Sequence, residues 1–232
     1  MLLTLEKLDL NFHLPKYAGI HENVGRRPNL AVFLDRDGVV IKEVDFVTEP
    51  SQLVVLPGAP GAIKLLSTQY YVIIVTNQSA IGRGLMNEDQ LFEIHAELLS
   101  RLGQDGAAVD GVYYCPHHPK LAFGAYMIDC KCRKPNPGML LQAAERWHLD
   151  LAGSFLIGDR QSDMDAAVAA GVRPILVGDG TLRLRTPVTS VSSLLEAAMM
   201  ILNETSDSSP ATADGLHPDQ ISVLDALIRE ES

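Results

Sequence analysis

Two aspartates separated by one residue, Asp35 and Asp37, are the first side chains along the chain whose types and spacing could do chemistry together. Alternate residues of an extended segment point the same way, so the two carboxylates would lie close together and repel each other. A bound divalent cation is the natural way to keep both of them ionised. Taken alone, the Asp-Gly pair that ends this run fits a plain turn after a strand equally well. The interpretation as a site therefore depends on other residues.

Three further polar clusters occur later in the chain. Thr76 begins a Thr-Asn-Gln-Ser run whose hydroxyl and amide groups can donate to phosphoryl oxygens. Arg133 and Lys134 supply the positive charge that a phosphate dianion needs. Asp159 could complete a carboxylate metal site, and Asp163 follows four residues later. Each cluster could also be an ordinary structural feature: a polar turn, a solvated basic patch or a helix N-cap. Four such features at four successive strand ends would be a strong coincidence. We therefore interpret the four clusters as one active site.

Each cluster follows a short apolar run rich in Val, Ile or Leu, as buried parallel strands are. Segments with helical spacing lie between these runs, and the alternation predicts an α/β fold, a doubly wound parallel sheet with helices on both faces. Ligands of such sheets bind beyond the carboxyl ends of the strands. The stretch from Gly38 to Gly58 leaves room only for a hairpin-sized excursion, so we expect no large cap domain. The strands are expected at 30–34, 72–75, 111–114, 155–157 and 174–177, and the helices at 58–69, 88–102, 139–147 and 163–170.

Length and charge restrict the class of protein. The 232 residues, 47% of them hydrophobic, suffice for one α/β domain with a buried core. The formal net charge of −10 disfavours polyanionic partners such as nucleic acid or an acidic membrane surface. No apolar run approaches the ~20 residues that span a bilayer, and the first residues lack the basic start of a signal peptide. We therefore expect a cytoplasmic protein.

All three cysteines of the chain fall in one short window, as Cys115, Cys130 and Cys132. Together with His117 they would supply three thiolates and an imidazole, which is the ligand set of a closed, structural zinc site. His118 could replace His117, and the plain alternative is three reduced cysteines beside a strand. Zinc would shape the loop that leads directly into the basic cluster.

The four polar clusters resemble the four motifs of the haloacid dehalogenase superfamily of phosphatases, over roughly residues 30–179. The resemblance implies that Asp35 is the nucleophile that becomes phosphorylated. Asp37 would protonate the leaving alcohol and then activate water. Asp35, Asp159 and the backbone carbonyl of Asp37 would hold magnesium. Thr76 and Lys134 would stabilise the transferring phosphoryl group.

The Cys-Pro-His-His-Pro run, the long insert after it and the Cys-x-Cys-Arg-Lys-Pro run resemble the D-glycero-D-manno-heptose 1,7-bisphosphate 7-phosphatases. The resemblance implies hydrolysis of a sugar phosphate monoester, at the 7-position of the heptose, through an aspartyl-phosphate. Histidinol-phosphate phosphatases share the arrangement with a shorter insert. A polynucleotide 3′-phosphatase shares the catalytic motifs but would need a basic groove to bind its substrate. A non-enzymatic descendant of a phosphatase would have lost at least one of the catalytic residues. Substrate contacts are expected from Glu43, Val44, Asp45, Phe46, Asn77, Gln78, Ser79, Arg133 and Arg160.

The two ends of the chain differ from its middle. Residues 8–14 alternate apolar and polar side chains, as a strand does. Residues 203–215 are rich in Ser, Thr, Asp and Ala, and residues 216–228 have apolar side chains at helical spacing. The predicted organisation is an N-terminal extension over 1–29, a phosphatase domain over 30–203, a flexible linker over 204–215 and an amphipathic helix or tail over 216–232.

Overall fold

The computed structural model describes residues 12–13, 29–178, 185 and 187–206. Within these residues a seven-stranded sheet of order β1-β4-β3-β2-β5-β6-β7 is the central layer. Strands β2 to β7 are parallel, and β1 adds to β4 in the antiparallel direction at one edge. The strands are β1 (Phe12–His13), β2 (Ala31–Leu34), β3 (Tyr71–Asn77), β4 (Gly111–Cys115), β5 (Phe155–Gly158), β6 (Arg173–Val177) and β7 (Thr189–Val191).

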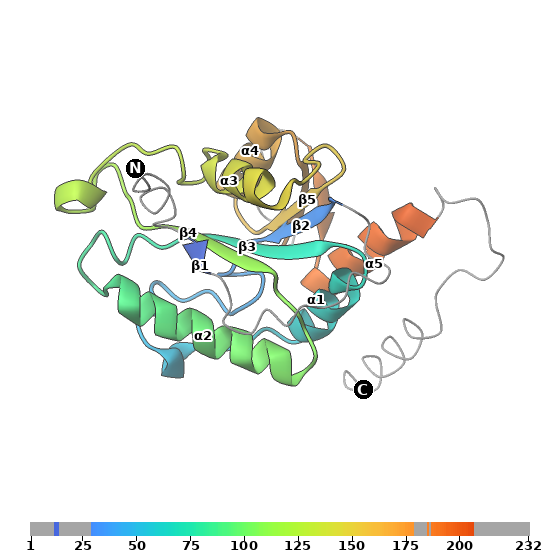
Figure 1. Cartoon of the computed structure of the whole chain (residues 1–232), viewed down its shortest axis with the longest axis horizontal. Helices are drawn as coiled ribbons and strands as arrows, with labels where there is room; N and C mark the ends of the chain where they lie inside the picture. The colour runs from blue at the N-terminus through green and yellow to red at the C-terminus, as the bar shows by residue number, and fades with distance from the viewer. Residues whose placement is uncertain (1–11, 14–28, 179–184, 186, 207–232) are drawn as a thin grey trace, which may run out of the picture.

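Helices cover both faces of the sheet (Figure 1). Helices α3 and α4 pack on one face, and α1, α2 and α5 pack on the other. The side chains of β3 alternate between the two apolar layers, with Val72 and Ile74 on the α1–α2–α5 side and Ile73 and Val75 on the α3–α4 side. The helices are α1 (Ala59–Ser67), α2 (Glu88–Gln104), α3 (Gly138–Trp147), α4 (Gln161–Ala170) and α5 (Leu194–Ser206), with short 3₁₀ turns at Pro50–Gln52 and Gly124–Tyr126.

The predicted doubly wound sheet is confirmed, and each of the nine predicted strands and helices is present. Strand β2 lies at the centre, and the chain continues from it to β3 and β4 on one side before it returns to β5, β6 and β7 on the other. Such a reversal of strand order opens a crevice at the carboxyl ends of the central strands. The central position of β2 therefore puts the residues that follow it at the crevice.

The segment from Gly38 to Gly58 is a compact loop with no domain of its own. Ile41 forms isolated bridges with Asp37 and with Val55, which hold the loop against the carboxyl end of β2. No large cap covers the sheet in the described part of the chain, so the crevice is bordered by loops. Across those residues, no helix is both long and apolar enough to cross a membrane.

Both ends of the described chain differ in detail from the sequence patterns. The strand pattern over 8–14 corresponds to β1, of which Phe12–His13 are described. Strand β7 and helix α5 were not predicted, and α5 runs to Ser206, into the first residues of the predicted linker. The rest of that linker and the predicted tail over 216–232 lie outside the described residues.

Candidate active site

A pocket of about 350 Å³ lies at the carboxyl ends of the central strands. Asp35 follows β2 directly, Thr76 and Asn77 end β3, and the Arg133–Lys134 pair comes from the loop between β4 and α3. All the predicted catalytic and substrate-contacting residues line this pocket: Asp35, Asp37, Glu43, Val44, Asp45, Phe46, Thr76, Asn77, Gln78, Ser79, Arg133, Lys134 and Arg160. Residues from four separate segments of the sequence are thus brought to one cavity.

Lys134 is a buried cation of the pocket, with 2% of its surface exposed. Its Nζ lies 2.9 Å from Asp35 Oδ1 and 2.6 Å from Asp163 Oδ1 and donates to the Val75 carbonyl oxygen at 2.9 Å. Burial lowers the pKa of Lys134, but the two carboxylates outweigh burial and leave the pKa above its usual value. The ammonium group is therefore charged and fixed by three acceptors.

Asp35 lies in an environment that opposes its ionisation. Burial raises its pKa to about 8, and the nearby carboxylates of Asp163 and Asp37 add to the effect, whereas Lys134 opposes it. One oxygen, Oδ1, accepts a hydrogen bond from the Arg36 backbone amide at 2.7 Å. An ionised Asp35 at neutral pH thus calls for more positive charge than Lys134 alone supplies.

Three carboxylates, those of Asp35, Asp159 and Asp163, each have an oxygen within 4.8 Å of the others. Asp159 Oδ1 is buried without a hydrogen-bond partner in the described structure, and Asp159 Oδ2 lies so close to Gly38 that a Cβ there would overlap it. Carboxylate oxygens are the ligands of hard divalent cations such as Mg²⁺. Asp159 Oδ1 does lie 3.8 Å from Arg160 Nε, beyond hydrogen-bond distance. The donor set, the crowded negative charge and the oxygen without a hydrogen bond all fit such an ion.

The third predicted magnesium ligand, Asp37, has its side chain directed away from this cluster. Its carboxylate accepts hydrogen bonds from Arg36 Nη2 at 2.9 and 3.0 Å, from Gln78 Nε2 at 2.8 Å and from Thr76 Oγ1 at 3.4 Å. Arg36 is 1% exposed, and its Nη1 lies 3.3 Å from Nε2 of His95 on α2. The side chain of Asp37 is thus held at the pocket wall, and only its backbone carbonyl is left for the predicted role toward the metal.

Several of the predicted substrate contacts are already engaged with other protein groups. The Asn77 amide donates to the Lys134 carbonyl oxygen at 3.2 Å and accepts from the Lys134 backbone amide at 3.1 Å. Arg160 forms an ion pair with Glu43, with Nη2 and Oε2 2.8 Å apart. Asn77 thereby fixes the backbone of Lys134, and the Glu43–Arg160 pair links the loop after β2 to the start of α4.

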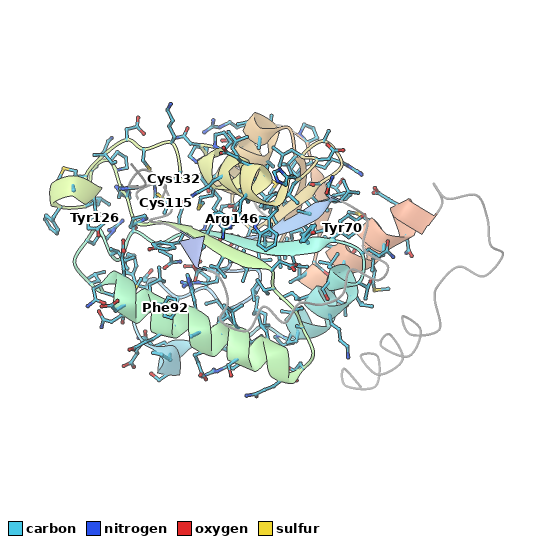
Figure 2. All side chains as sticks on the ribbon, viewed as in Figure 1. Tyr70, Phe92, Cys115, Tyr126, Cys132 and Arg146 are labelled. Carbon is cyan, nitrogen blue, oxygen red and sulfur yellow. The ribbon has the colours of Figure 1, made fainter. Side chains whose placement is uncertain are left out.

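A second potential metal site lies beside the pocket, at the end of β4. Cys115, His117, Cys130 and Cys132 each offer one atom within 4.8 Å of the others, and Figure 2 shows Cys115 and Cys132 side by side at the end of that strand. Five of the six separations are 3.2 to 3.6 Å. These values approach the edges of about 3.8 Å of a tetrahedron with Zn–S bonds of about 2.3 Å.

His118 is not part of this cluster, because its Nδ1 accepts hydrogen bonds from the backbone amides of Lys120 and Leu121, each at 3.1 Å. Arg133 is tied to the cluster on both sides. Its backbone amide donates to Cys130 Sγ at 3.4 Å, and its Nη1 donates to the His117 carbonyl oxygen at 3.2 Å. The geometry of the cysteine loop therefore determines where Arg133 stands in the pocket.

Comparison with known proteins agrees with this geometry. The family model for HAD-hydrolase-like proteins matches residues 131–197. D-glycero-beta-D-manno-heptose-1,7-bisphosphate 7-phosphatase of Photorhabdus laumondii is 38% identical over 179 residues, which are 76% of this chain and 92% of that protein. The protein of the same name from Rhodopseudomonas palustris is 45% identical over 148 residues, 63% of this chain and 81% of its own.

A crystal structure of D,D-heptose 1,7-bisphosphate phosphatase from B. bronchiseptica, complexed with magnesium and phosphate, superposes with a TM-score of 0.68. It is 37% identical, and the match covers 75% of this chain and 99% of that one. This chain belongs to the heptose bisphosphate 7-phosphatase family of HAD-like phosphatases. The family and the phosphoric monoester hydrolase activity predicted from the sequence are thereby confirmed.

Four site residues of this HAD-like phosphatase had no role assigned from the sequence. Asp163 joins the carboxylate cluster and pairs with Lys134, Arg36 holds Asp37 and is itself in contact with His95, and Arg83 lines the pocket. Asp163 could have been found, since it is the last residue of a motif already noted. Nothing in the local sequence marks His95 or Arg83, because only the tertiary fold brings His95 to Arg36 and Arg83 to the pocket.

Proposed function

We propose that this enzyme hydrolyses D-glycero-D-manno-heptose 1,7-bisphosphate at the 7-position, through an aspartyl-phosphate on Asp35. The observation that carries the proposal is the contact of Lys134 Nζ with both Asp35 and Asp163, at 2.9 and 2.6 Å, at the wall of a loop-bordered pocket. A nucleophilic carboxylate can approach an anionic phosphate only where positive charge is close by. Relatives named for the beta and the alpha anomer are 45% and 43% identical, so both anomers are candidates.

In the first step, a carboxylate oxygen of Asp35 bonds to the phosphorus at the 7-position while the bond from phosphorus to the sugar oxygen breaks. Asp37 gives its proton to the departing alkoxide. In the second step, Asp37 takes a proton from the water that attacks phosphorus and regenerates Asp35. Thr76 donates to the transferring phosphoryl group, and the positive charge of Lys134 stabilises that group throughout. The contacts of Asp37 with Arg36 and Gln78 hold its carboxylate in place for both proton transfers.

Magnesium would be held by Asp35, Asp159 and the Asp37 backbone carbonyl, with Asp163 in the same cluster. When bound, it neutralises charge on the phosphoryl oxygens and on the nucleophile. The raised pKa of Asp35, about 8 from burial and from its acidic neighbours, explains why the site needs that charge.

We further propose that Cys115, His117, Cys130 and Cys132 hold one structural Zn²⁺. Three thiolates and an imidazole form a closed ligand set with no open position for catalysis. The role of zinc is then to fix the loop that presents Arg133 to the substrate. Reduced thiols at this site suit the cytoplasm, where we expect the enzyme to act.

Phosphate release from three substrates tests the proposal: heptose 1,7-bisphosphate, histidinol phosphate and a 3′-phosphorylated oligonucleotide. We expect kcat/KM for the heptose bisphosphate to exceed the other two by at least about 100-fold, because differential contacts worth a few kcal/mol suffice for that ratio. Preferential release from histidinol phosphate or from the oligonucleotide would reject the assigned substrate.

A further inference from the structure

Arg83 is an arginine of the pocket that has no partner for its charge within the described structure. It lies on the turn that follows β3, and its Nε is buried without a hydrogen-bond acceptor. Its guanidinium group lies over the ring of Phe46, 5.2 Å from the ring centroid. A ring face attracts a cation but leaves the in-plane N–H donors unused. These donors border the pocket and are available to a ligand.

The backbone on either side holds Arg83 in place. The Arg83 amide donates to the Ser79 carbonyl oxygen at 3.0 Å, and the Phe123 amide donates to the Gly82 carbonyl oxygen at 2.7 Å. A Cβ on Gly82 would come within 2.6 Å of the Pro116 carbonyl oxygen, so this turn is packed tightly against the cysteine loop. An arginine presented from a pinned turn loses little conformational entropy when it binds a ligand.

The other arginines of the pocket already have acceptors. Arg36 is bound to Asp37, Arg160 to Glu43, and Arg133 donates one hydrogen bond to the His117 carbonyl oxygen. Arg83 and Arg133 both line the pocket. The turn of Arg83 packs against the Pro116 carbonyl oxygen, and Arg133 contacts the carbonyl oxygen of the next residue, His117. Two like charges side by side favour an anion between them.

We infer that Arg83, together with Arg133, binds the phosphate group of the substrate that is not transferred. This inference rests on the proposed function, because a bisphosphate presents a second dianion whereas a monophosphate does not. Lys134 and Thr76 serve the transferred phosphoryl group, and Arg83 on the turn beyond Ser79 serves the other. Arg83 is thus a determinant of the preference for a sugar bisphosphate over a sugar monophosphate.

The test compares kcat and KM for heptose 1,7-bisphosphate and heptose 7-phosphate in the wild type, Arg83→Gln and Arg83→Lys. The two substrates share the reacting phosphate and the leaving group, so the ratio of their kcat/KM values isolates the second phosphate. We expect Arg83→Gln to raise KM for the bisphosphate about 10- to 100-fold, as for the loss of a hydrogen bond to a charged group, with kcat and both constants for the monophosphate changed less than about 3-fold. Arg83→Lys should recover part of the loss, because it keeps the charge but not the fork of donors.

Arg173→Gln is the matched control. Arg173 also lies over a phenylalanine ring, that of Phe155 at 4.5 Å, but it begins β6 at the opposite end of the sheet. Its replacement should leave both substrates unaffected. If the wild type prefers the bisphosphate and Arg83→Gln keeps that preference in full, the inference is overturned and the proposed function stands. A wild type with no preference for the bisphosphate over the monophosphate would overturn the inference alone, whereas a wild type that releases the 7-phosphate from neither substrate would overturn both.

Discussion

Asp35 and Asp37 are two residues apart in sequence, yet their carboxylates have different surroundings. Asp35 contacts Lys134 and lies within the carboxylate cluster, where each further negative charge raises its pKa. Asp37 is surrounded by donors, from Arg36, Gln78 and Thr76. In the proposed mechanism, one strand end thus supplies a nucleophile beside a cation site and a proton carrier held by hydrogen bonds, which is the division of work that a two-step phosphoryl transfer requires.

The residue that separates them makes this division possible. Arg36 is almost fully buried and turns its guanidinium group back onto Asp37, with His95 of α2 against its other edge. Truncating His95 would therefore act on Asp37 through Arg36, which makes His95 a positioning residue.

At the residue scale we predict that Asp37→Asn lowers kcat for the sugar phosphate by about 10²- to 10⁴-fold, as for the loss of a general acid and base. Both steps lose their proton carrier, but p-nitrophenyl phosphate has a leaving group that departs without a proton. On that substrate the variant should release p-nitrophenol in a burst of up to one equivalent and then turn over slowly, because the aspartyl-phosphate accumulates. Rapid-mixing absorbance measures the burst. Wild-type kcat, or slow release without a burst, would contradict the role of Asp37.

At the scale of elements, the strands and helices that could be predicted are those marked by a pattern of neighbouring residues in the sequence. Strands such as β3 are buried apolar runs, and α2 begins at Asn87 with a capping box that a sequence displays. Strand β7 was missed because it has three residues, two of them exposed and polar. Helix α5 carries apolar side chains at helical spacing and was within reach of the same reasoning.

The residues of the site, like the strands and helices, were predicted only where their signal is local in the sequence. Motif residues were predicted because their spacing is visible along the chain, as for Asp35 and Asp37. The surroundings of these residues could not be predicted, because they come from distant parts of the sequence. His95, which contacts Arg36, lies 59 residues after it, and the turn of Arg83 is held by a loop some 40 residues later. Which of two adjacent histidines joins the cysteines was also left open, and it depends on the hydrogen bonds that His118 makes with its own loop.

The cysteine loop is the element that would connect the proposed zinc site to substrate binding. We predict that His117→Ala lowers the zinc content and raises KM several-fold, with a smaller effect on kcat, because Arg133 loses its fixed position while the nucleophile keeps its own. His118→Ala is the matched control and should retain one zinc per chain, because His118 lies outside the ligand set. Elemental analysis of both purified variants, with steady-state kinetics, checks this. Loss of zinc in His118→Ala but not in His117→Ala would reverse the assignment.

At the scale of the whole molecule, an acidic protein of net charge −10 carries a pocket in which five cationic side chains stand beside four carboxylates. A small phosphorylated sugar suits such a protein better than a polyanion does. The last of the proposed catalytic residues in the sequence is Asp163. Helix α5 completes the described domain, and its Ile201 and Leu202 are buried in the apolar core. The proposed division of the chain therefore puts everything needed for turnover before the segment 207–232.

We predict that a protein ending at Ser206 keeps kcat and KM within about 2-fold of the full chain and unfolds within about 1 kcal/mol of it, the range usual for changes remote from the core. Urea denaturation and phosphate release measure the two properties. A truncated protein that folds but loses activity would mean that the C-terminal segment contributes to the pocket.

The central claim is that Asp35 forms a covalent bond to phosphorus, and the most direct measurement is the turnover of Asp35→Asn. The amide is nearly isosteric and cannot act as the nucleophile, so the fold and the zinc content should be retained. We predict that kcat with saturating magnesium falls by more than about 10⁴-fold, the scale seen when a covalent nucleophile is removed. Magnesium-dependent turnover of Asp35→Asn within about 100-fold of the wild type would contradict the aspartyl-phosphate mechanism.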